Sequence, residues 1–197
     1  MNWYEKLNQY FPIEEMKSKD HMETLLKEKS EVYHKDEGPN HVLMYAEFDS
    51  FIFIDYVYVS GNVRGQGLGH KLIEKLKSKN KPIILEVEPV DYEDSDTEKR
   101  LHFYKREGFI HAQSIGYTRR SLATNEINQM EILYWSPNEG DSEETIYEKM
   151  KRMYEDIHTY KDEKFYGKSY QPVEEVLTLD ENRESEDILD SLDRTKA

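Results

Sequence analysis

A glycine-rich segment between Val59 and His70 has the composition of an anion-binding turn. Glycines stand at positions 65, 67 and 69, where the missing side chains let the backbone turn tightly and bring several N–H groups close to a ligand. A helix predicted to follow adds free N–H groups and the positive end of its dipole. Arg64 adds a fixed positive charge. The segment predicts a phosphate or pyrophosphate site, with a tight strand-to-helix connection as the alternative.

Two common glycine-rich loops do not fit this spacing. A dinucleotide-binding fingerprint has two residues before its last glycine, and here one residue separates Gly67 from Gly69. A nucleotide-binding P-loop requires Lys and then Ser or Thr after its last glycine, and here His70 and Lys71 follow. The anion predicted at this loop is therefore held by a third kind of turn.

The flanking elements alternate between strand-like and helix-like patterns, which indicates an α/β fold with helices against a sheet. Strands are predicted where aromatic and β-branched residues gather, at 31–34, 41–47, 51–59, 82–87, 109–113 and 131–135. Helical spacing of apolar residues is seen at 13–28, 68–77 and 97–107. The glycine-rich turn thus connects the strand ending at Val59 to an amphipathic helix.

The composition changes near residue 140, so three regions are expected: a domain at 1–138, a helical extension at 139–170 and an acidic, mostly disordered tail at 171–197. Residues 139–197 hold 18 acidic and nine basic residues and so carry most of the net charge of −14. Apolar residues at 146, 150, 153 and 157 form one face of a helix over 143–158. That face is expected to pack on the domain or to form a homodimer.

Two sequence blocks resemble the GNAT N-acetyltransferase family. The first is Val59-x-x-x-x-Arg64-Gly-x-Gly67-x-Gly69, which is similar to the acetyl-coenzyme A loop of that family. The second is Leu85-Glu-Val87 followed by a helix that ends Phe-Tyr-Lys-Arg-Glu-Gly108-Phe. Both blocks occur in the family's order and on the expected elements, and the resemblance spans about residues 31–135.

The resemblance implies a central mixed, mostly antiparallel sheet flanked by helices, with acetyl-CoA as co-substrate and no metal. It implies that the pyrophosphate lies on the loop amides and that the pantetheine arm runs beside the strand ending at Val59, as an added strand would. The cofactor-binding residues implied in this way are Val57, Val59, Arg64, Gly65, Gln66, Gly67, Leu68, Gly69, His70 and Thr97.

The resemblance also implies a proton donor for the departing thiolate at Tyr104, although this tyrosine could simply pack on its helix. Glu86 is the first candidate for the base, because a carboxylate beside a desolvated cleft is expected to have a raised pKa. Asp55, the acid inside an apolar strand, is the second, and alternation places it on the face of Val57. Glu88 or a chain of waters remains possible.

The sequence departs from the family pattern near the second block. Thr97 stands where an Asn is usual, Arg100 where a small residue is usual, and the acidic segment 88–97 is about six residues longer than the common form. The acidic segment could attract a cationic amine such as a polyamine, an aminoglycoside or a lysine side chain. It could equally be a solvated loop, and a non-catalytic acyl-CoA-binding or interaction module is the alternative function.

The overall composition excludes several classes of protein. The sequence has no cysteine, which excludes disulfides and thiol chemistry, and its histidines lack metal-ligand spacing. A charge of −14 argues against nucleic acid and against an anionic membrane surface. The longest apolar run, 51–59, is too short to span a bilayer. With no secretory signal visible, a cytoplasmic enzyme acting on a small molecule or a protein amine is expected.

Overall fold

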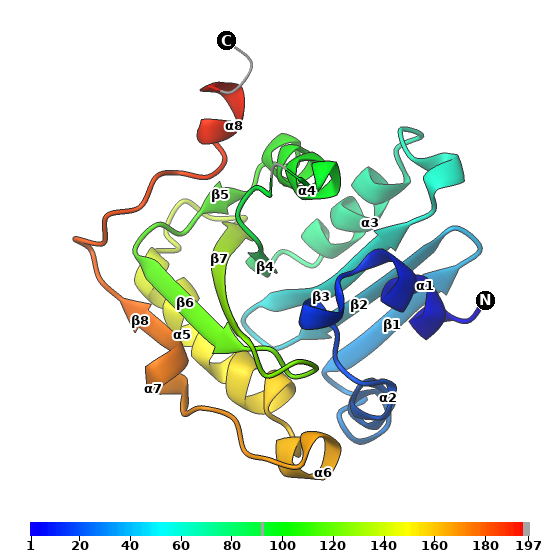
Figure 1. The fold of residues 1–197 in the computed structure, drawn as a ribbon. Coiled ribbons are helices and arrows are strands. Elements are labelled where there is room, and N and C mark those ends of the chain that lie inside the picture. The colour runs from blue at the N-terminus through cyan, green and yellow to red at the C-terminus, as the bar shows by residue number, and fades with distance from the viewer. Residues whose placement is uncertain (92, 195–197) are drawn as a thin grey trace.

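A mixed sheet of eight strands forms the centre of the computed structural model, which describes residues 1–91 and 93–194 (Figure 1). The strand order is β1-β2-β3-β4-β7-β6-β8, and β5 also pairs with β7. The pairing of β3 with β4 is parallel, and the other pairings are antiparallel. The strands are β1 (Tyr33–Gly38), β2 (His41–Glu47), β3 (Ile52–Val59), β4 (Ile83–Val87), β5 (Ile110–His111), β6 (Ile115–Arg120), β7 (Ile127–Trp135) and β8 (Leu177–Leu179). The predicted fold class is confirmed.

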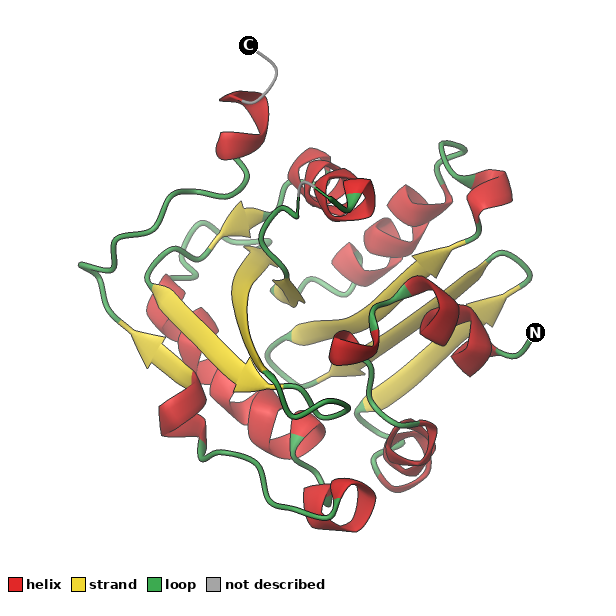
Figure 2. Cartoon of the chain, in the orientation of Figure 1, coloured by secondary structure: helices red, strands yellow, loops and turns green. Residues whose placement is uncertain are grey.

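Helices cover both faces of this sheet, which Figure 2 shows in red around the yellow strands. Their bounds are α1 (Trp3–Tyr10), α2 (Lys19–Glu28), α3 (Leu68–Lys77), α4 (Ser95–Arg106), α5 (Glu143–Met153), α6 (Asp162–Tyr166), α7 (Val173–Val176) and α8 (Ser191–Arg194), with short 3-10 turns at Ile13–Glu15 (η1) and Gly61–Val63 (η2) and a π-helical turn at Tyr154–His158 (η3). One core joins α1, α2 and α5 to one face, and a second joins α3 and α4 to the other. Strand β2 therefore buries side chains on both faces.

Local sequence explains helix α3, whose predicted bounds agree with the structure. Leu72, Ile73 and Leu76 are buried on its inner side, and two lysines in the last turn complement the negative end of its dipole. The helix begins directly after Gly67, which has a left-handed backbone conformation with φ 83°. The glycine-rich loop is thus held at the start of a helix that is well packed on the sheet.

The N-terminal region differs from the single helix predicted over residues 13–28. The structure has the 3-10 turn η1 and then α2, with an extended Ser18 between them. The Ser18 hydroxyl oxygen accepts a hydrogen bond from the His21 N–H and so starts a new helix. Helix α1 and strand β6 were not predicted from the sequence. As a result, η1 does not continue into α2, and its last residue, Glu15, accepts a hydrogen bond through its carbonyl oxygen from the Tyr56 hydroxyl on β3.

The chain after residue 139 is packed on the sheet. The apolar face of the predicted helix at 143–158 is fully buried, because Ile146, Met150, Met153 and Ile157 all belong to the first core. This face is therefore covered within the chain and is not available to a second copy.

Within residues 1–91 and 93–194, no helix is long and apolar enough to cross a membrane.

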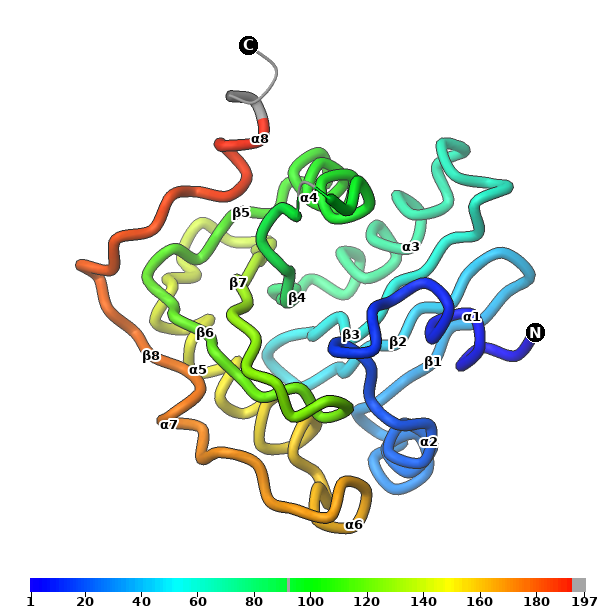
Figure 3. The backbone as a smooth tube through the Cα atoms, in the orientation of Figure 1, coloured from blue at the N-terminus to red at the C-terminus, as the bar shows by residue number. Residues whose placement is uncertain are grey.

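The acidic segment from residue 171 onward also differs from the mostly disordered tail that was expected. Strand β8 pairs with the edge strand β6, and Leu189 and Leu192 are buried in the second core. Figure 3 shows the segment running along the side of the molecule back to α4. Strand β6 supplies backbone hydrogen bonds to this segment, so a few buried apolar residues are sufficient to hold it. The sequence pattern did not predict β6, and the packing of the segment was therefore not expected.

Candidate active site

Strands β3 and β4 are hydrogen-bonded over only part of their length and leave an opening in the sheet beyond it. These parallel strands pair only where Ile52–Ile54 faces Ile83–Leu85, although β3 continues to Val59 and β4 to Val87. Beyond the paired part, the backbone of β3 that faces β4 has no partner strand within the described residues. A cavity of about 550 Å³ lies at this opening and is lined by both strands, the glycine-rich loop, α4 and the segment from Tyr10 to Glu15.

The glycine-rich loop forms one end of the cavity. Gly65 and Gly67 have φ values of 82° and 83°, in the left-handed region that a glycine adopts without strain. No side chain of residues 1–91 or 93–194 caps the first N–H groups of α3, so these donors remain available to an anion. Gly69 serves a different purpose, since a Cβ atom there would lie 3.2 Å from ring carbons of Phe103 on α4. The loop glycines thus shape the turn and let α3 and α4 approach each other.

The predicted cofactor residues line this one cavity, with a single exception. Val57, Val59, Arg64, Gly65, Gly67, Leu68, Gly69, His70 and Thr97 all line it, whereas Gln66 is exposed outside it. The Thr97 hydroxyl lies 2.8 Å from the Asp94 carbonyl oxygen and accepts a hydrogen bond from the Asp91 N–H. This hydroxyl therefore holds the acidic segment against the start of α4, and its polar capacity is used within the protein.

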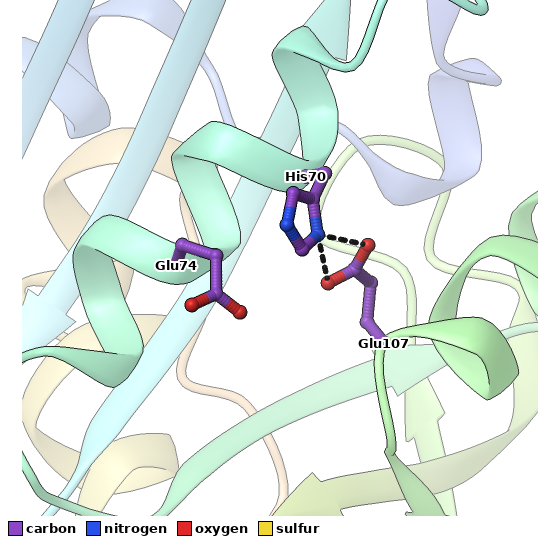
Figure 4. A group of neighbouring side chains, drawn as sticks. All are labelled: His70, Glu74 and Glu107. Atoms are coloured by element: carbon purple, nitrogen blue, oxygen red, sulfur yellow. Dashed lines mark hydrogen bonds and ion pairs between the residues drawn. The ribbon is translucent and has the colours of Figure 1, made fainter.

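Two side chains of the loop, Arg64 and His70, are held in place by neighbouring groups. The Arg64 Nε donates to the Val59 carbonyl oxygen at 3.2 Å, and the guanidinium lies 4.9 Å from the ring centre of Tyr10. The His70 ring bonds through Nδ1 to both carboxylate oxygens of Glu107, at 2.9 and 3.0 Å (Figure 4). These contacts place two positively polarised groups beside the free amides of α3.

His70, Glu74 and Glu107 are the group in the described part of the chain whose ligand atoms approach closely enough to surround a metal ion. Figure 4 shows His70 and Glu74 on successive turns of α3, facing Glu107 at the end of α4. Lys77 already lies 3.6 Å from a Glu74 oxygen and 3.9 Å from a Glu107 oxygen. The ammonium supplies the positive charge that these carboxylates need, so the group acts as an ion-pair cluster joining the two helices.

Tyr104 lies on the inner side of α4 and lines the cavity with only 5% of its surface exposed. Its ring packs edge-on against Phe103 and Phe109. Burial raises the pKa of the hydroxyl well above its usual value. Among the described residues the hydroxyl has no hydrogen-bond partner. A protonated hydroxyl without a protein partner therefore lies at the cavity, as a proton donor requires.

The raised pKa expected for Glu86 is wrong. Although the side chain is buried, the pKa of its carboxyl is lowered, because electrostatic interactions with His158 and Arg119 and hydrogen bonds from His158 and Tyr117 outweigh the burial. The His158 Nε2 lies 2.7 Å and the Tyr117 hydroxyl 2.5 Å from the same carboxylate oxygen. Glu86 lines the cavity as a stable anion, which makes it a weak base.

The face predicted for Asp55 is also wrong, because a β-bulge interrupts the alternation of β3. Met44 pairs with Tyr56 and the next residue, Tyr45, pairs with Ile54, so Asp55 is the extra residue. Its carboxylate bonds the Lys17 ammonium at 2.7 Å and the Tyr33 hydroxyl at 2.6 Å. Tyr33 belongs to the first core, whereas Val57 packs on the second. Asp55 is thus part of a buried ion pair.

A pair of carboxyl groups that the sequence did not bring together lies inside the cavity. Glu15, on η1, shares a hydrogen bond with Glu88, directly after β4, and both line the cavity. Burial and the negative charge of Glu88 raise the pKa of Glu15 to about 8, against the opposing charges of Arg100 and Arg119. Glu88 was a sequence candidate, but no local signal distinguishes Glu15 from its neighbour Glu14.

Comparisons with known proteins agree with this architecture. A family model described as an acetyltransferase (GNAT) domain matches residues 29–111. A protein of Bacillus subtilis (strain 168) named "Putative acetyltransferase YjbC" is 70% identical over 192 residues, which cover 98% of this chain and 100% of that protein. A solved structure named "Putative acetyltransferase from GNAT family from Bacteroides thetaiotaomicron" shares the fold, with a TM-score of 0.61 and 22% identity over 84% of this chain and 90% of that chain.

Proposed function

Because this chain belongs to the GNAT family of acetyltransferases, we propose that it transfers the acetyl group of acetyl-CoA to a primary amine by direct attack. The observation that carries the proposal is the cavity itself. It joins an anion-binding turn, an open strand edge and the protonated hydroxyl of Tyr104. These are the three features that an acyl-CoA donor and its leaving thiolate require.

The cofactor is proposed to lie along the opening between β3 and β4. Its pyrophosphate binds the N–H groups from Arg64 to Gly69, where the dipole of α3 and the cations of the loop favour negative charge. Its pantetheine arm follows Val57–Val59, where β3 no longer pairs with β4. The thioester then reaches the interior of the cavity, where Tyr104 lies.

In the proposed reaction the neutral amine nitrogen attacks the carbonyl carbon of the thioester. A C–N bond forms, the C–S bond breaks, and the departing thiolate takes the proton of the Tyr104 hydroxyl. The proton that the nitrogen loses on becoming an amide then restores the Tyr104 hydroxyl. Burial keeps this hydroxyl protonated until the thiolate forms beside it. Glu86 and Asp55 are proposed to act through their negative charge and their structural contacts, because the buried Arg119 lies beside Glu86 and the buried Lys17 beside Asp55.

Substituting Gly67 by Ala is expected to weaken acetyl-CoA binding about tenfold. An L-residue in the left-handed region costs roughly 1–2 kcal/mol, and a change of 1.4 kcal/mol corresponds to a factor of ten in Kd. No atom lies within 4 Å of the added Cβ, so the effect arises from the backbone alone. Isothermal titration calorimetry with acetyl-CoA measures it.

Gly61→Ala is the matched control for this substitution. Gly61 also has open space around its added Cβ but does not have a positive φ, so its variant is expected to bind acetyl-CoA as the wild type does. Equal affinity of the Gly67 variant and the wild type would contradict the proposed pyrophosphate position.

Thiol release on a panel of amines tests the function itself. Transfer of the acetyl group, detected as free CoA and as an acetylated amine by mass spectrometry, is the expected result. Tight binding of acetyl-CoA without transfer to any amine would instead favour a non-catalytic acyl-CoA-binding module.

A further inference from the structure

We propose that Glu15 and Glu88 together form the site that receives the ammonium group of a cationic amine acceptor and takes its proton. This inference rests on the proposed N-acetyltransferase activity. It identifies the acceptor as an amine that is protonated in solution, and it assigns the base to a pair of carboxyl groups from two distant segments.

The charged residues that line the cavity differ between the part proposed to bind CoA and the part proposed to bind the amine. Toward the loop and α4 the cavity is lined by the cationic Arg64, Lys99, Arg100 and Arg106, together with the acidic Asp96 and Glu107. The interior has carboxylates from η1, β3 and β4, namely Glu15, Asp55, Glu86 and Glu88. A polyanionic CoA is attracted to the first group and repelled by the second. The acidic interior is therefore left for a cation.

Only the Glu15–Glu88 pair among these carboxylates is available to a ligand. Asp55 is held by Lys17, and Glu86 is held by His158, Tyr117 and Arg119. Among the described residues, the cation that forms an ion pair with Glu15 is Arg100, at 4.0 Å from Oε2. Glu15 has 15% of its side chain exposed, and Glu88 is half-buried, so both can reach a molecule in the cavity.

The position of the Tyr104 hydroxyl is a second observation that supports an acceptor site at this pair. The Tyr104 hydroxyl is buried, has no partner among the described residues and interacts electrostatically with Glu15. An amine between the carboxyl pair and Tyr104 would have its base on one side and the proton donor for the thiolate on the other. Two titratable groups held in different protonation states are the arrangement that acid–base catalysis requires.

The pKa of Glu15 depends on the charged and titratable groups of several neighbouring elements. Glu88 from β4 raises the pKa of Glu15, while Arg100 from α4 and Arg119 from β6 lower it. Tyr56 and Tyr104 also interact with Glu15 and stay neutral because burial raises the pKa of both. With one proton shared below about pH 8, the pair becomes a base as the pH rises through that range.

The first test is a titration of the carboxyl groups by ¹³C NMR on the full chain with CoA bound. One glutamate carboxyl is expected to titrate near pH 8 in the wild type and to be missing in Glu15→Gln. In Glu88→Gln it should move to lower pH, because the like charge is removed while burial remains. Glu14→Gln changes the same charge on the same turn outside the cavity and should leave the signal unchanged. A Glu15 signal at the ordinary value near 4.3 would overturn the proposal.

The second test follows the rate of thiol release at saturating acetyl-CoA with spermidine, kanamycin and a lysine-containing peptide. The kcat of the wild type should rise with pH to a midpoint that is the same for amines of different basicity, since it belongs to the enzyme. Glu15→Gln should lower kcat about 10²-fold, as expected for the loss of a general base, and Glu14→Gln should not. Unchanged kcat and pH profile in Glu15→Gln would overturn the proposal.

The two tests separate this inference from the function on which it rests. If the wild type acetylates none of the amines, the proposed function fails, and the NMR titration still decides whether an amine binds at the pair. A bound ammonium must lower the titration midpoint of Glu15. If spermidine at millimolar concentration leaves that midpoint unchanged, the acceptor site is overturned independently of turnover.

Discussion

Replacing Tyr104 by Phe is expected to lower kcat about 10²–10⁴-fold, the range typical of a lost general acid. The hydroxyl lines the cavity and has no partner in the described chain, so its removal breaks no hydrogen bond within the protein. The ring would keep its packing against Phe103 and Phe109. Stopped assays of CoA release with the best amine of the panel measure the effect.

The control for this prediction is Tyr45→Phe. Tyr45 is buried in the same core as Tyr104 but does not line the cavity. Its variant is expected to retain the activity of the wild type, and both variants should bind acetyl-CoA with unchanged Kd. A loss below threefold for Tyr104→Phe would show that the thiolate takes its proton from another group or from water.

Replacing Lys17 by Met is expected to lower the free energy of unfolding by about 3–5 kcal/mol, as is typical when one partner of a buried ion pair is removed. The two side chains are 3% and 4% exposed and their charged atoms lie 2.7 Å apart. The substitution leaves Asp55 buried with a hydrogen bond from Tyr33 but without a counter-charge. Urea denaturation followed by circular dichroism measures the change.

Lys19→Met is the matched control, because Lys19 forms an exposed ion pair with Glu23 on α2. An exposed pair contributes about 0–1 kcal/mol, so the control should be nearly neutral. Adding Asp55→Asn to Lys17→Met should recover part of the lost stability, since the uncompensated charge is removed. Similar small losses for both lysine variants would contradict the view that this pair holds the N-terminal segment on β3.

The Lys17 pair also supports the proposed acceptor site. The Tyr56 hydroxyl accepts a hydrogen bond from the Lys17 N–H and donates one to the Glu15 carbonyl oxygen. Two residues of the N-terminal segment are therefore fixed to β3 by one tyrosine, and the side chain of Glu15 starts from a fixed backbone. Asp55, the second sequence candidate for the base, instead stabilises the segment that carries Glu15 through its ion pair with Lys17.

Features that depend on nearby residues could be predicted from the sequence. The bounds of α3 and β2 were correct because apolar spacing, glycine position and strand propensity are local properties. The glycine-rich loop was found in the same way, since three glycines and an arginine before an amphipathic helix define the turn by themselves. The mixed, mostly antiparallel sheet followed from the two motif blocks.

The acid–base groups could not be predicted, because the protonation of a carboxyl depends on charges that are distant in sequence. His158 is 72 residues from Glu86, and Tyr117 is 31 residues from it. Their contacts reversed the expected direction of its pKa shift. One extra residue in β3 likewise moved Asp55 to the other face, since alternation holds only for a regular strand.

The sequence by itself determined that this protein has a glycine-rich turn on a GNAT fold, because that turn is formed by consecutive residues. Only the tertiary structure decided which carboxyl groups are free. It brings η1 and the end of β4 together at the opening of the sheet, where burial and mutual repulsion raise the pKa of Glu15. Such an effect exists only when two segments more than 70 residues apart share one desolvated cavity.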